Sequence, residues 1–383
     1  MKMEGPASAV SVSLSCVQPV AQLRRARHRM MKQRVLTGTR PTSLVRREIL
    51  VPRKSNEPSI ADVAAKAGVS PTTVSRVLNS RGYLSDETKR KVADAMAELN
   101  YRPNEVARAL LGRHTNIVGI ILPTVSLPFF GELATYLENA FTEHGYRTLL
   151  CNSLGRAEIE RDYLIQLEGN RVDGLIAAAH NSSIPEYSTT RLPVVTVDRE
   201  LGEHIPNVRA DNFEGGRMAT ELLVERGCRR PLLLTSRTGP HNLREAGYRA
   251  ALKEAGVEPV IATVLFGTPE PERTQQIHGI LDELRNTVDG VFATDDLAAC
   301  TAIEWARQRD VSVPEEFRIV GFDGTMAIQA AVPWLTTIRQ PLEQIAHAAV
   351  DLLVERIETN TVEKSPSKVT LEFPVTLLNG TTA

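Results

Sequence analysis

Between Ile117 and Asp323, short apolar runs alternate with longer amphipathic stretches. The runs are rich in valine, isoleucine and leucine, and they read IVGIILP, RTLLCN, GLIAAA, VVTVD, PLLLTS, VIATVLF, GVFAT and FRIVGFD. Such runs are typical of strands covered on both faces, and the stretches between them have helical spacing. We predict an α/β domain of two similar lobes, each a parallel sheet flanked by helices. In such folds a ligand lies at the carboxyl ends of the strands, here between the lobes.

A different pattern precedes this domain in residues 59–79, SIADVAAKAGVSPTTVSRVLN. It predicts a short helix, a tight turn and a second helix. Gly68 suits the left-handed conformation of such a turn, Ser70 can cap the second helix, and Pro71 can occupy its first position. A third amphipathic helix, SDETKRKVADAMAELN, follows with Ser85 as its cap. Together they predict a small all-α helix-turn-helix domain, and the residues expected in its core are Val63, Val69, Val74, Val77, Leu78, Val92, Met96 and Leu99.

Charge is distributed unevenly along the 383 residues, a length that suits two or three domains. Residues 1–113 carry an excess of lysine and arginine, and the remainder carries an excess of aspartate and glutamate. The basic end is where a polyanion would bind. No apolar run approaches the ~18 residues of a membrane helix. The four cysteines, Cys16, Cys151, Cys228 and Cys300, are far apart and lack metal-ligand spacing, so we expect a cytoplasmic protein without a metal or another cofactor.

Residues 1–57 are rich in serine, proline and arginine and show no persistent apolar period. We expect this extension to be disordered. A start codon assigned too far upstream is an alternative, with Met30 or Met31 as the internal start. A genuine basic tail would add unspecific affinity for phosphates. The stretch before Cys16 is only weakly similar to an export leader, because serine, glutamine and proline interrupt it.

Several motifs together resemble the LacI/GalR family of bacterial transcription regulators, over nearly the whole chain from Ser59 onward. In the family's order they are IADVAAKAGVSPTTVSRVLN, NYRPNEVARALLG, ADNFEGGRMATELLVERG, Arg244-Glu-Ala-Gly247, VPEEFRIVGFDG and PWLTTIRQP. The resemblance implies a helix-turn-helix domain at 58–102, a hinge helix and linker at 103–114, and a two-lobed effector-binding and dimerisation domain at 115–383. That last domain is similar to periplasmic sugar-binding proteins, with three crossovers between its lobes. The implied function is a sequence-specific regulator, most often a repressor, whose operator affinity is modulated by a small-molecule effector such as a sugar.

By this resemblance, the second helix enters the major groove with its first residues facing base edges. Arg76 can donate two hydrogen bonds to guanine, worth about 1–3 kcal/mol of discrimination, or it can clamp a phosphate instead. Pro71 offers no donor where relatives often carry a larger polar or aromatic residue, which weakens the case for direct readout at that step. Ser59, Asn79 and Tyr83 are expected to contact phosphates. The full set of expected DNA contacts is Ser59, Ser70, Pro71, Thr72, Thr73, Ser75, Arg76, Asn79, Tyr83, Asn104, Ala107 and Leu110.

Residues 104–111 correspond to the hinge helix of the family. Leu110 is expected to enter a base step of the minor groove and kink the duplex, as other apolar wedges do. The alternative is that Leu110 packs between helices. Because so short a helix is unstable alone, DNA and a second copy of the chain must help to fold it. We expect a homodimer, or a dimer of dimers, on a roughly palindromic double-stranded operator.

The resemblance places effector contacts on the facing strand ends, at Phe129, Phe130, Asp198, Arg199, Arg244, Phe292, Asp295 and Asp323. Asp323 and Arg244 would divide the hydroxyls of a sugar between an acceptor and a fork of donors. Asp295 stands where the family often has asparagine, which favours a ligand richer in donors. Two plainer roles stay open, because Phe292 can be strand core and Asp198 can pair with a basic residue. Gly215-Gly216 is expected to permit close helix packing rather than to bind phosphate.

Two other classes of protein fit the sequence less well. Asp295 and Asp296 are neighbouring carboxylates, as in acid–base catalysis, but no Gly-x-Ser-x-Gly, HExxH or Walker sequence accompanies them. We therefore predict no catalytic residue and no metal ligand. An exported solute-binding protein would share the two-lobed domain, but it has no use for a helix-turn-helix.

Overall fold

The computed structural model of the chain describes residues 58–78, 84–101, 114–178, 181, 184–202, 204–359 and 369–383. The chain divides into two compact units, Met1–Tyr101 and Arg102–Ala383. The expectations for residues 1–57 and for the hinge helix at 104–111 lie outside the described residues. Within the described ranges, no helix is both long and apolar enough to cross a membrane.

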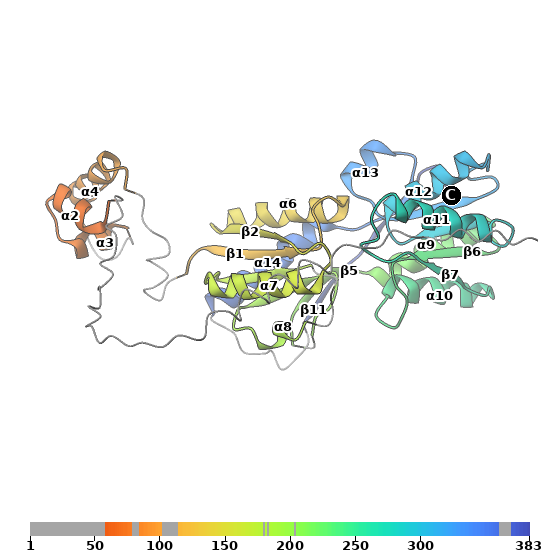
Figure 1. Cartoon of the computed structure of the whole chain (residues 1–383), viewed down its shortest axis with the longest axis horizontal. Helices are drawn as coiled ribbons and strands as arrows, with labels where there is room; N and C mark the ends of the chain where they lie inside the picture. The colour runs from red at the N-terminus through yellow and green to blue at the C-terminus, as the bar shows by residue number, and fades with distance from the viewer. Residues whose placement is uncertain are drawn as a thin grey trace, which may run out of the picture. The chain divides into compact units, whose positions relative to one another are not determined.

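The first unit is a helix-turn-helix followed by a third helix (Figure 1), built from α2 (Ile60–Ala67), α3 (Pro71–Leu78) and α4 (Asp86–Glu98). Gly68 ends α2 with a φ of 67°, as the turn requires. The Ser70 hydroxyl accepts a hydrogen bond from the Thr73 amide at 3.1 Å, and Ser85 caps α4 in the same way at 3.3 Å. These three predictions are confirmed. The buried core consists of Val63, Ala64, Val74, Val92, Ala95 and Tyr101.

The second unit begins with a lobe built on a six-stranded parallel sheet, which we call the N-lobe. Its strands are β1 (Ile117–Leu122), β2 (Arg147–Asn152), β3 (Gly174–Ala177), β4 (Val194–Val197), β5 (Asn207–Ala210) and β11 (Thr370–Phe373), in the order β11-β5-β4-β3-β1-β2. Helices α6 (Pro128–Glu143) and α14 (Leu342–Glu358) pack on one face. Helices α7 (Ala157–Gly169) and α8 (Glu186–Thr189) cover the other.

The other lobe of this unit, the C-lobe, has the same plan. Its strands are β6 (Pro231–Thr235), β7 (Val260–Thr263), β8 (Gly290–Ala293), β9 (Arg318–Asp323), β10 (Thr336–Arg339) and β12 (Thr376–Leu378), in the order β12-β10-β9-β8-β6-β7. All pairings are parallel except that of β12 with β10. Helices α9 (Asn212–Glu225) and α10 (Leu243–Ala255) cover one face, and α11 (Glu272–Leu284) and α12 (Asp296–Gln308) cover the other. A short helix, α13 (Met326–Ala331), follows β9.

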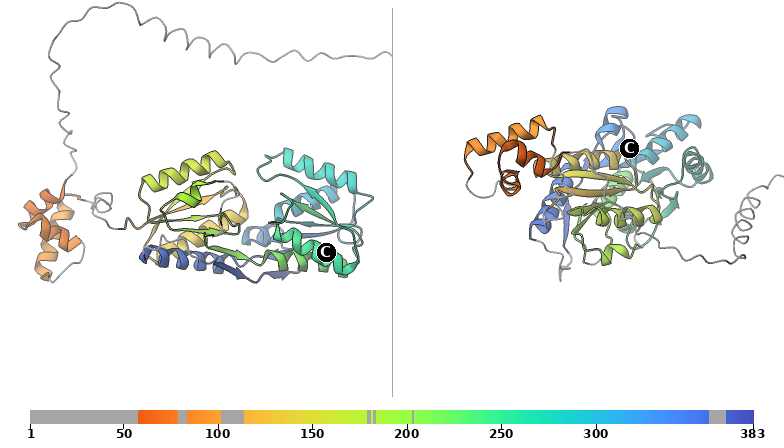
Figure 2. Two further views of the ribbon diagram at one scale, coloured as in Figure 1. Left: turned by 90° about the horizontal axis from the view of Figure 1, so that it is seen from below. Right: turned by 60° about the vertical axis from the view of Figure 1, so that its left-hand side comes forward.

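The chain crosses between the two lobes three times, after β5, after β10 and after β11. Figure 2 shows the lobes side by side, with α14 running along the edge where the connections lie. The predicted fold class is confirmed: an all-α domain is followed in the sequence by two α/β lobes whose strands are parallel except for β12.

Candidate nucleic-acid interface and ligand cleft

Helix α3 turns a polar face outward. It buries Val74 completely, and this fixes which side of the helix faces solvent. No acidic residue stands in its first turn, so nothing neutralises the positive end of the helix dipole, where an anion binds best. Residues three and four apart share a helix face, and the outward face carries Pro71, Thr72, Ser75 and Arg76, of which only Ser75 is half-buried.

The other predicted DNA contacts of this unit cap helices. The Ser59 hydroxyl donates to the Asp62 carboxylate at 2.7 Å and accepts from its amide at 3.4 Å. The Ser70 and Thr73 hydroxyls lie 2.9 Å apart at the start of α3. Both caps sit at helix N-termini, where phosphates are commonly held. Asn79, Tyr83, Asn104, Ala107 and Leu110 lie outside the described residues.

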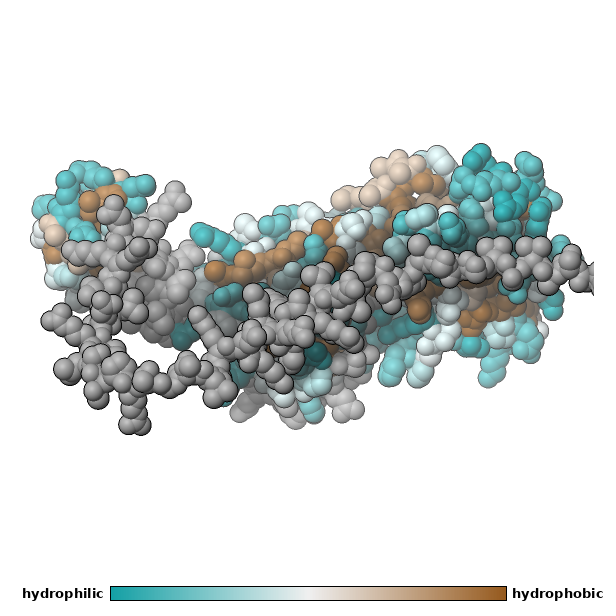
Figure 3. All heavy atoms as spheres, viewed as in Figure 1, coloured by the Kyte–Doolittle hydropathy of each residue, from teal (hydrophilic) through white to brown (hydrophobic). Residues whose placement is uncertain are grey.

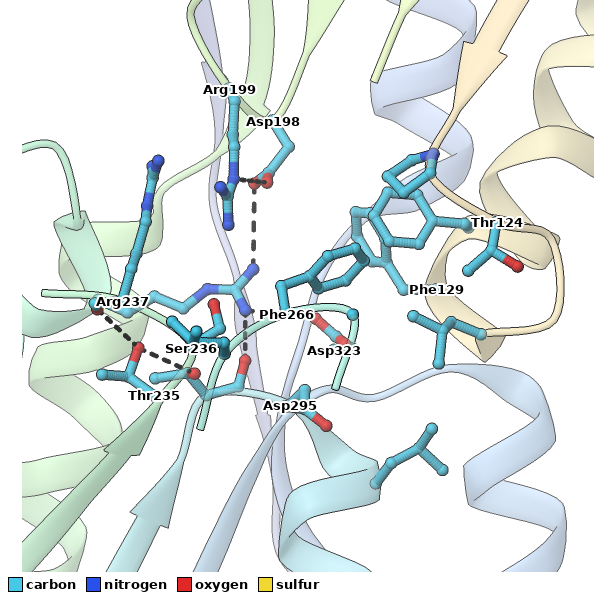
Figure 4. A pocket seen from close by; sticks show the side chains of 18 of the residues that line it. Thr124, Phe129, Asp198, Arg199, Thr235, Ser236, Arg237, Phe266, Asp295 and Asp323 are labelled. Atoms are coloured by element: carbon cyan, nitrogen blue, oxygen red, sulfur yellow. Dashed lines mark hydrogen bonds and ion pairs between the residues drawn. The ribbon is translucent and has the colours of Figure 1, made fainter. Parts of the chain in front are cut away.

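The two-lobed unit contains a cleft of about 1120 Å³ that both lobes line. Its walls come from residues that follow the carboxyl ends of strands, together with the N-terminus of α6 (Figure 4). The lining includes seven of the eight predicted effector contacts, namely Phe129, Phe130, Asp198, Arg199, Arg244, Asp295 and Asp323.

The prediction that Phe292 lines this cleft is wrong. Its side chain is 0% exposed and lies in the C-lobe core, with its ring centroid 6.2 Å from that of Phe322. The reason is that β8 is covered on both faces, so every residue within it is buried. Only the residues after the strand, beginning with Thr294, reach the cleft.

Two aspartates of the cleft adopt positive φ angles at strand ends. Asp198 has a φ of 65° directly after β4, and Asp323 has a φ of 110° at the end of β9. The first angle is one that aspartate tolerates, whereas the second is rare for any residue with a side chain. Strained backbone of this kind clusters at ligand sites.

Arg244 lines the cleft and is held by several partners. Its Nε donates to Asn212 Oδ1 at 2.7 Å, and Nη1 donates to the Thr294 carbonyl at 2.5 Å. The guanidinium carbon lies 3.8 Å from the centre of the Phe322 ring, within the range of a cation–π contact. Asp323 lies 3.6 Å from the same group. Arg244 is therefore held in place before any ligand arrives.

Close packing of α9 on α10 positions this arginine. A Cβ on Gly216 would lie 2.2 Å from the Arg244 carbonyl oxygen, and one on Gly247 would lie 2.0 Å from the Phe213 carbonyl oxygen. Only glycine permits such an approach. The prediction that Gly215-Gly216 serves helix packing is confirmed, since a Cβ on Gly215 would also meet the Phe322 ring at 2.7 Å.

The neighbouring carboxylates Asp295 and Asp296 face different partners. Asp295 caps α12 by accepting a hydrogen bond from the Ala298 amide at 2.9 Å. Both of its carboxylate oxygens also accept from Arg273 Nη2 at 2.9 Å. Asp296 is 2% exposed and accepts from the Thr337 hydroxyl at 2.5 Å and the Gly324 amide at 2.8 Å. Burial raises the pKa of Asp296 to about 7, and burial also raises the pKa of Asp323 above its usual range. Asp295 therefore joins the start of α12 to α11, and Asp296 joins it to β10 and to the loop after β9.

Several cleft residues were not predicted from the sequence. Arg237 follows β6, Phe266 follows β7, and Thr325 follows β9. The Phe266 ring meets Phe130 of the N-lobe edge to face, with centroids 6.2 Å apart. The signal that could have found all three is their place just beyond a strand end. Among the described residues, no group of three or more histidine, cysteine, aspartate or glutamate side chains could hold a metal ion.

Comparison with known proteins gives consistent matches. The pattern of bacterial regulatory proteins, lacI family, matches residues 59–104, and that of the periplasmic binding protein-like domain matches residues 220–382. A sucrose operon repressor from Streptococcus mutans is 41% identical over 324 residues, which is 84% of this chain and 98% of that protein. A ribose operon repressor from Bacillus subtilis is 36% identical over 327 residues, 84% of this chain and 97% of that protein. The solved structure of the lac repressor dimer bound to operator and the anti-inducer ONPF covers 85% of this chain and 99% of its own, with 26% identity and a TM-score of 0.74.

Proposed function

Because the chain belongs to the lacI family of bacterial regulatory proteins, we propose that it is a cytoplasmic transcriptional repressor whose grip on its operator is modulated by a sugar. One observation carries this proposal: a single chain joins an exposed polar recognition helix to a cleft lined by both lobes. The relatives named for sucrose and ribose operons support the class of effector and the sign of regulation. We further propose that the protein acts by binding alone, since the relatives are regulators and not enzymes.

Helix α3, the recognition helix, carries the side chains that would distinguish one DNA sequence from another. Thr72 and Arg76 lie on its outward face. An arginine there can bond guanine through both O6 and N7, whereas a threonine can donate to a base or pack its methyl group on thymine. One such helix covers only a half-site, so two copies on a roughly palindromic operator are needed for full specificity.

The N-lobe offers a surface for pairing two copies. Strand β2 is the edge of its sheet, and Leu149 and Leu150 on it are 41% and 47% exposed. Figure 3 shows a hydrophobic strip along this side of the lobe. Adjacent exposed apolar residues on an edge strand are a candidate surface for pairing with another chain. We propose a homodimer, or a dimer of dimers, and light scattering of the purified protein measures which.

The cleft suits a polar ring. Arg244 provides donors, Asp323 provides an acceptor, and the rings of Phe129, Phe130 and Phe266 form an aromatic wall beside them. This combination of hydroxyl-binding groups and an apolar face is how proteins hold sugars. The cleft volume of about 1120 Å³ leaves room for the lobes to close on a ligand.

The proposal is tested by fluorescence anisotropy of the purified protein. The duplex upstream of its own gene and a scrambled duplex are titrated at fixed salt, with and without a panel of sugars. We expect tight binding to the first duplex only, and release of that duplex by one sugar. Equal, weak and strongly salt-dependent binding to both duplexes would leave only a basic surface and refute the proposal.

A variant separates the ligand site from the DNA site. Asp323→Asn keeps the size and shape of the side chain at this strained φ of 110° and removes its carboxylate. We expect operator binding without sugar to stay unchanged, and the concentration of sugar needed for release to rise at least tenfold. If Asp323→Asn instead abolishes operator binding in the absence of sugar, Asp323 has a structural role.

A further inference from the structure

The charges in the cleft fall into a paired set and an incompletely paired set. Arg209 bonds Glu200 at 2.9 Å and Glu372 at 2.8 Å. Arg273 bonds Asp295 through both carboxylate oxygens at 2.9 Å. These two arginines are neutralised within the protein.

Arg199, Arg237 and Arg244 form a guanidinium cluster whose pairing is incomplete. Asp198 lies 3.9 Å from Arg199 and 3.9 Å from Arg244, and both separations exceed a direct hydrogen bond. Its one close bond is from the Asn212 amide at 3.2 Å. Across the described ranges, no carboxylate lies within ion-pair distance of the Arg237 guanidinium. Within the part of the chain that the structure describes, the cluster of three guanidinium groups therefore has only Asp198 and Asp323 nearby, and neither carboxylate is within hydrogen-bond distance of any of the three.

This arrangement has an electrostatic cost. Arg199 is only 20% exposed, and its burial, together with the charges of Arg237 and Arg244, lowers its pKa to about 10 despite the nearby Asp198. Burial also lowers the pKa of Arg237. Cations that are desolvated and close to one another are stabilised by any anion that enters between them. The cluster therefore favours an anion between its members.

The two outer members of the cluster belong to different lobes. Arg199 follows β4 of the N-lobe, and Arg237 follows β6 of the C-lobe. Figure 4 shows them on one side of the cleft, away from Phe129 and Thr124. An anion bound by both would connect the lobes directly.

Next to the cluster, the C-lobe wall offers groups suited to a neutral, hydroxylated part of a ligand. Thr325 is among the residues that line the cleft and is 1% exposed, and its buried hydroxyl has no hydrogen-bond partner among the described atoms. Buried hydroxyls without partners are rare in proteins, and a ligand is one way to satisfy them. Asp323 lies two residues away and supplies an acceptor.

We infer that the effector is a phosphorylated sugar, with its phosphate between Arg199 and Arg237 and its hydroxyls at Thr325 and Asp323. This inference rests on the proposed function and specifies its ligand. A phosphate fits better than a carboxylate, because a single arginine fork satisfies the two oxygens of a carboxylate. A phosphate has three free oxygens and close to two negative charges, and it can serve several guanidinium groups at once.

The test is isothermal titration calorimetry of the full chain with matched pairs of ligands. Each of sucrose, fructose, glucose and ribose is compared with its monophosphate ester, and gluconate and inorganic phosphate are added as probes. We expect one phosphate ester to bind at least tenfold more tightly than its parent sugar. A parent sugar that binds as tightly as its ester, gluconate or inorganic phosphate that binds as tightly as any ester, or no binding by any ester, would overturn the inference.

Variants locate the phosphate. Arg237→Gln removes a guanidinium that has no ion pair within the described chain, and should weaken ester binding roughly tenfold or more while leaving the parent sugar within twofold. Arg226→Gln removes the same charge at the exposed end of α9, outside the cleft, and should change neither affinity. An equal loss for ester and parent sugar in Arg237→Gln would refute the assignment of the phosphate.

Operator binding, measured in parallel, distinguishes the two proposals. An ester that binds through Arg237 but leaves operator affinity unchanged supports the phosphate site and contradicts the proposed switch. A neutral sugar that releases the operator supports the switch and contradicts the phosphate site.

Discussion

Arg244 links the architecture of the C-lobe to the chemistry of the cleft. It lies in the first turn of α10, donates to Asn212 of α9 and to the loop after β8, and covers the Phe322 ring. Three elements therefore fix one guanidinium, and a ligand that bonds it loses little additional side-chain entropy. Because the position of the guanidinium depends on all three elements, a shift in any one of them should change ligand affinity.

Arg76 is the residue on which operator choice should depend most. Arg76→Ala should reduce the preference for the operator over a scrambled duplex by about 1–3 kcal/mol, because the two hydrogen bonds to guanine are lost. The measurement is a pair of anisotropy titrations at one salt concentration. Arg90→Ala, which removes an exposed charge from α4, should weaken binding to the operator and to the scrambled duplex by the same factor. An unchanged preference in Arg76→Ala would make this residue a phosphate contact.

Asp296 predicts how stability depends on pH. The pKa of its carboxyl is about 7 in the folded protein because of burial, and 3.8 is its ordinary value. The folded state therefore binds more protons between these values, and the free energy of unfolding should fall as pH rises from about 4 to about 7. Asp296→Asn should remove that part of the slope in urea unfolding. Trp305, which is 0% exposed in the C-lobe, reports the transition, and Glu258→Gln on the surface is the control.

At the scale of elements, sequence patterns predicted strands that are apolar runs and helices that are strongly capped, but not the short buried strands β5 and β10. Strands β1, β6 and β9 are continuous apolar runs, and α4 and α12 begin at capping residues. The crossover elements were not assigned. Strands β11 and β12 are three or four residues long and largely exposed, so neither apolar period nor length distinguishes them from loops.

The site was predictable where a residue ends a strand and unpredictable where packing decides. Asp198 and Asp323 were predicted from the family resemblance, and their position agrees with the rule that ligands meet the carboxyl ends of strands. The prediction for Phe292 was wrong because the residue lies within β8, which is covered on both faces, and the cleft begins two residues later at Thr294. Arg237 was missed since an arginine in a loop after a strand has many surface roles. Its meaning depends on Arg199, 38 positions earlier in the chain, and on a lobe contact that no local pattern encodes.

Adding one methyl group at Gly216 tests whether the close contact of α9 with α10 positions Arg244. In Gly216→Ala the new Cβ would meet the Arg244 backbone, so α10 must move outward. We expect a loss of about 1–3 kcal/mol in unfolding free energy from overpacking, and weaker ligand binding because Arg244 is displaced. Gly279→Ala on α11 meets nothing within 4 Å and should be neutral or stabilising. Normal ligand affinity in Gly216→Ala would show that α9 does not position Arg244.

At the scale of the whole molecule, the two activities must be thermodynamically coupled. If the sugar weakens operator affinity by some factor, the operator must weaken sugar affinity by the same factor. Typical coupling of about 1–3 kcal/mol corresponds to a change of roughly 5- to 150-fold. Calorimetric titration of the effector into free protein and into the protein–operator complex measures one factor, and anisotropy measures the other. Unequal factors would show that the effector also acts outside this two-site scheme.

The three crossovers let the two walls of the cleft bind one ligand at the same time. Because the chain passes between the lobes after β5, β10 and β11, the two walls cannot drift apart. A ligand that has met one wall faces the other at a fixed effective concentration, in the millimolar range or above for short connections. Two contacts that are weak in isolation then multiply, but only for a molecule long enough to reach both walls. The three crossovers therefore make affinity depend on the length of a ligand as well as on its chemistry. Sugars too short to contact both walls do not gain this added affinity, even with the same functional groups.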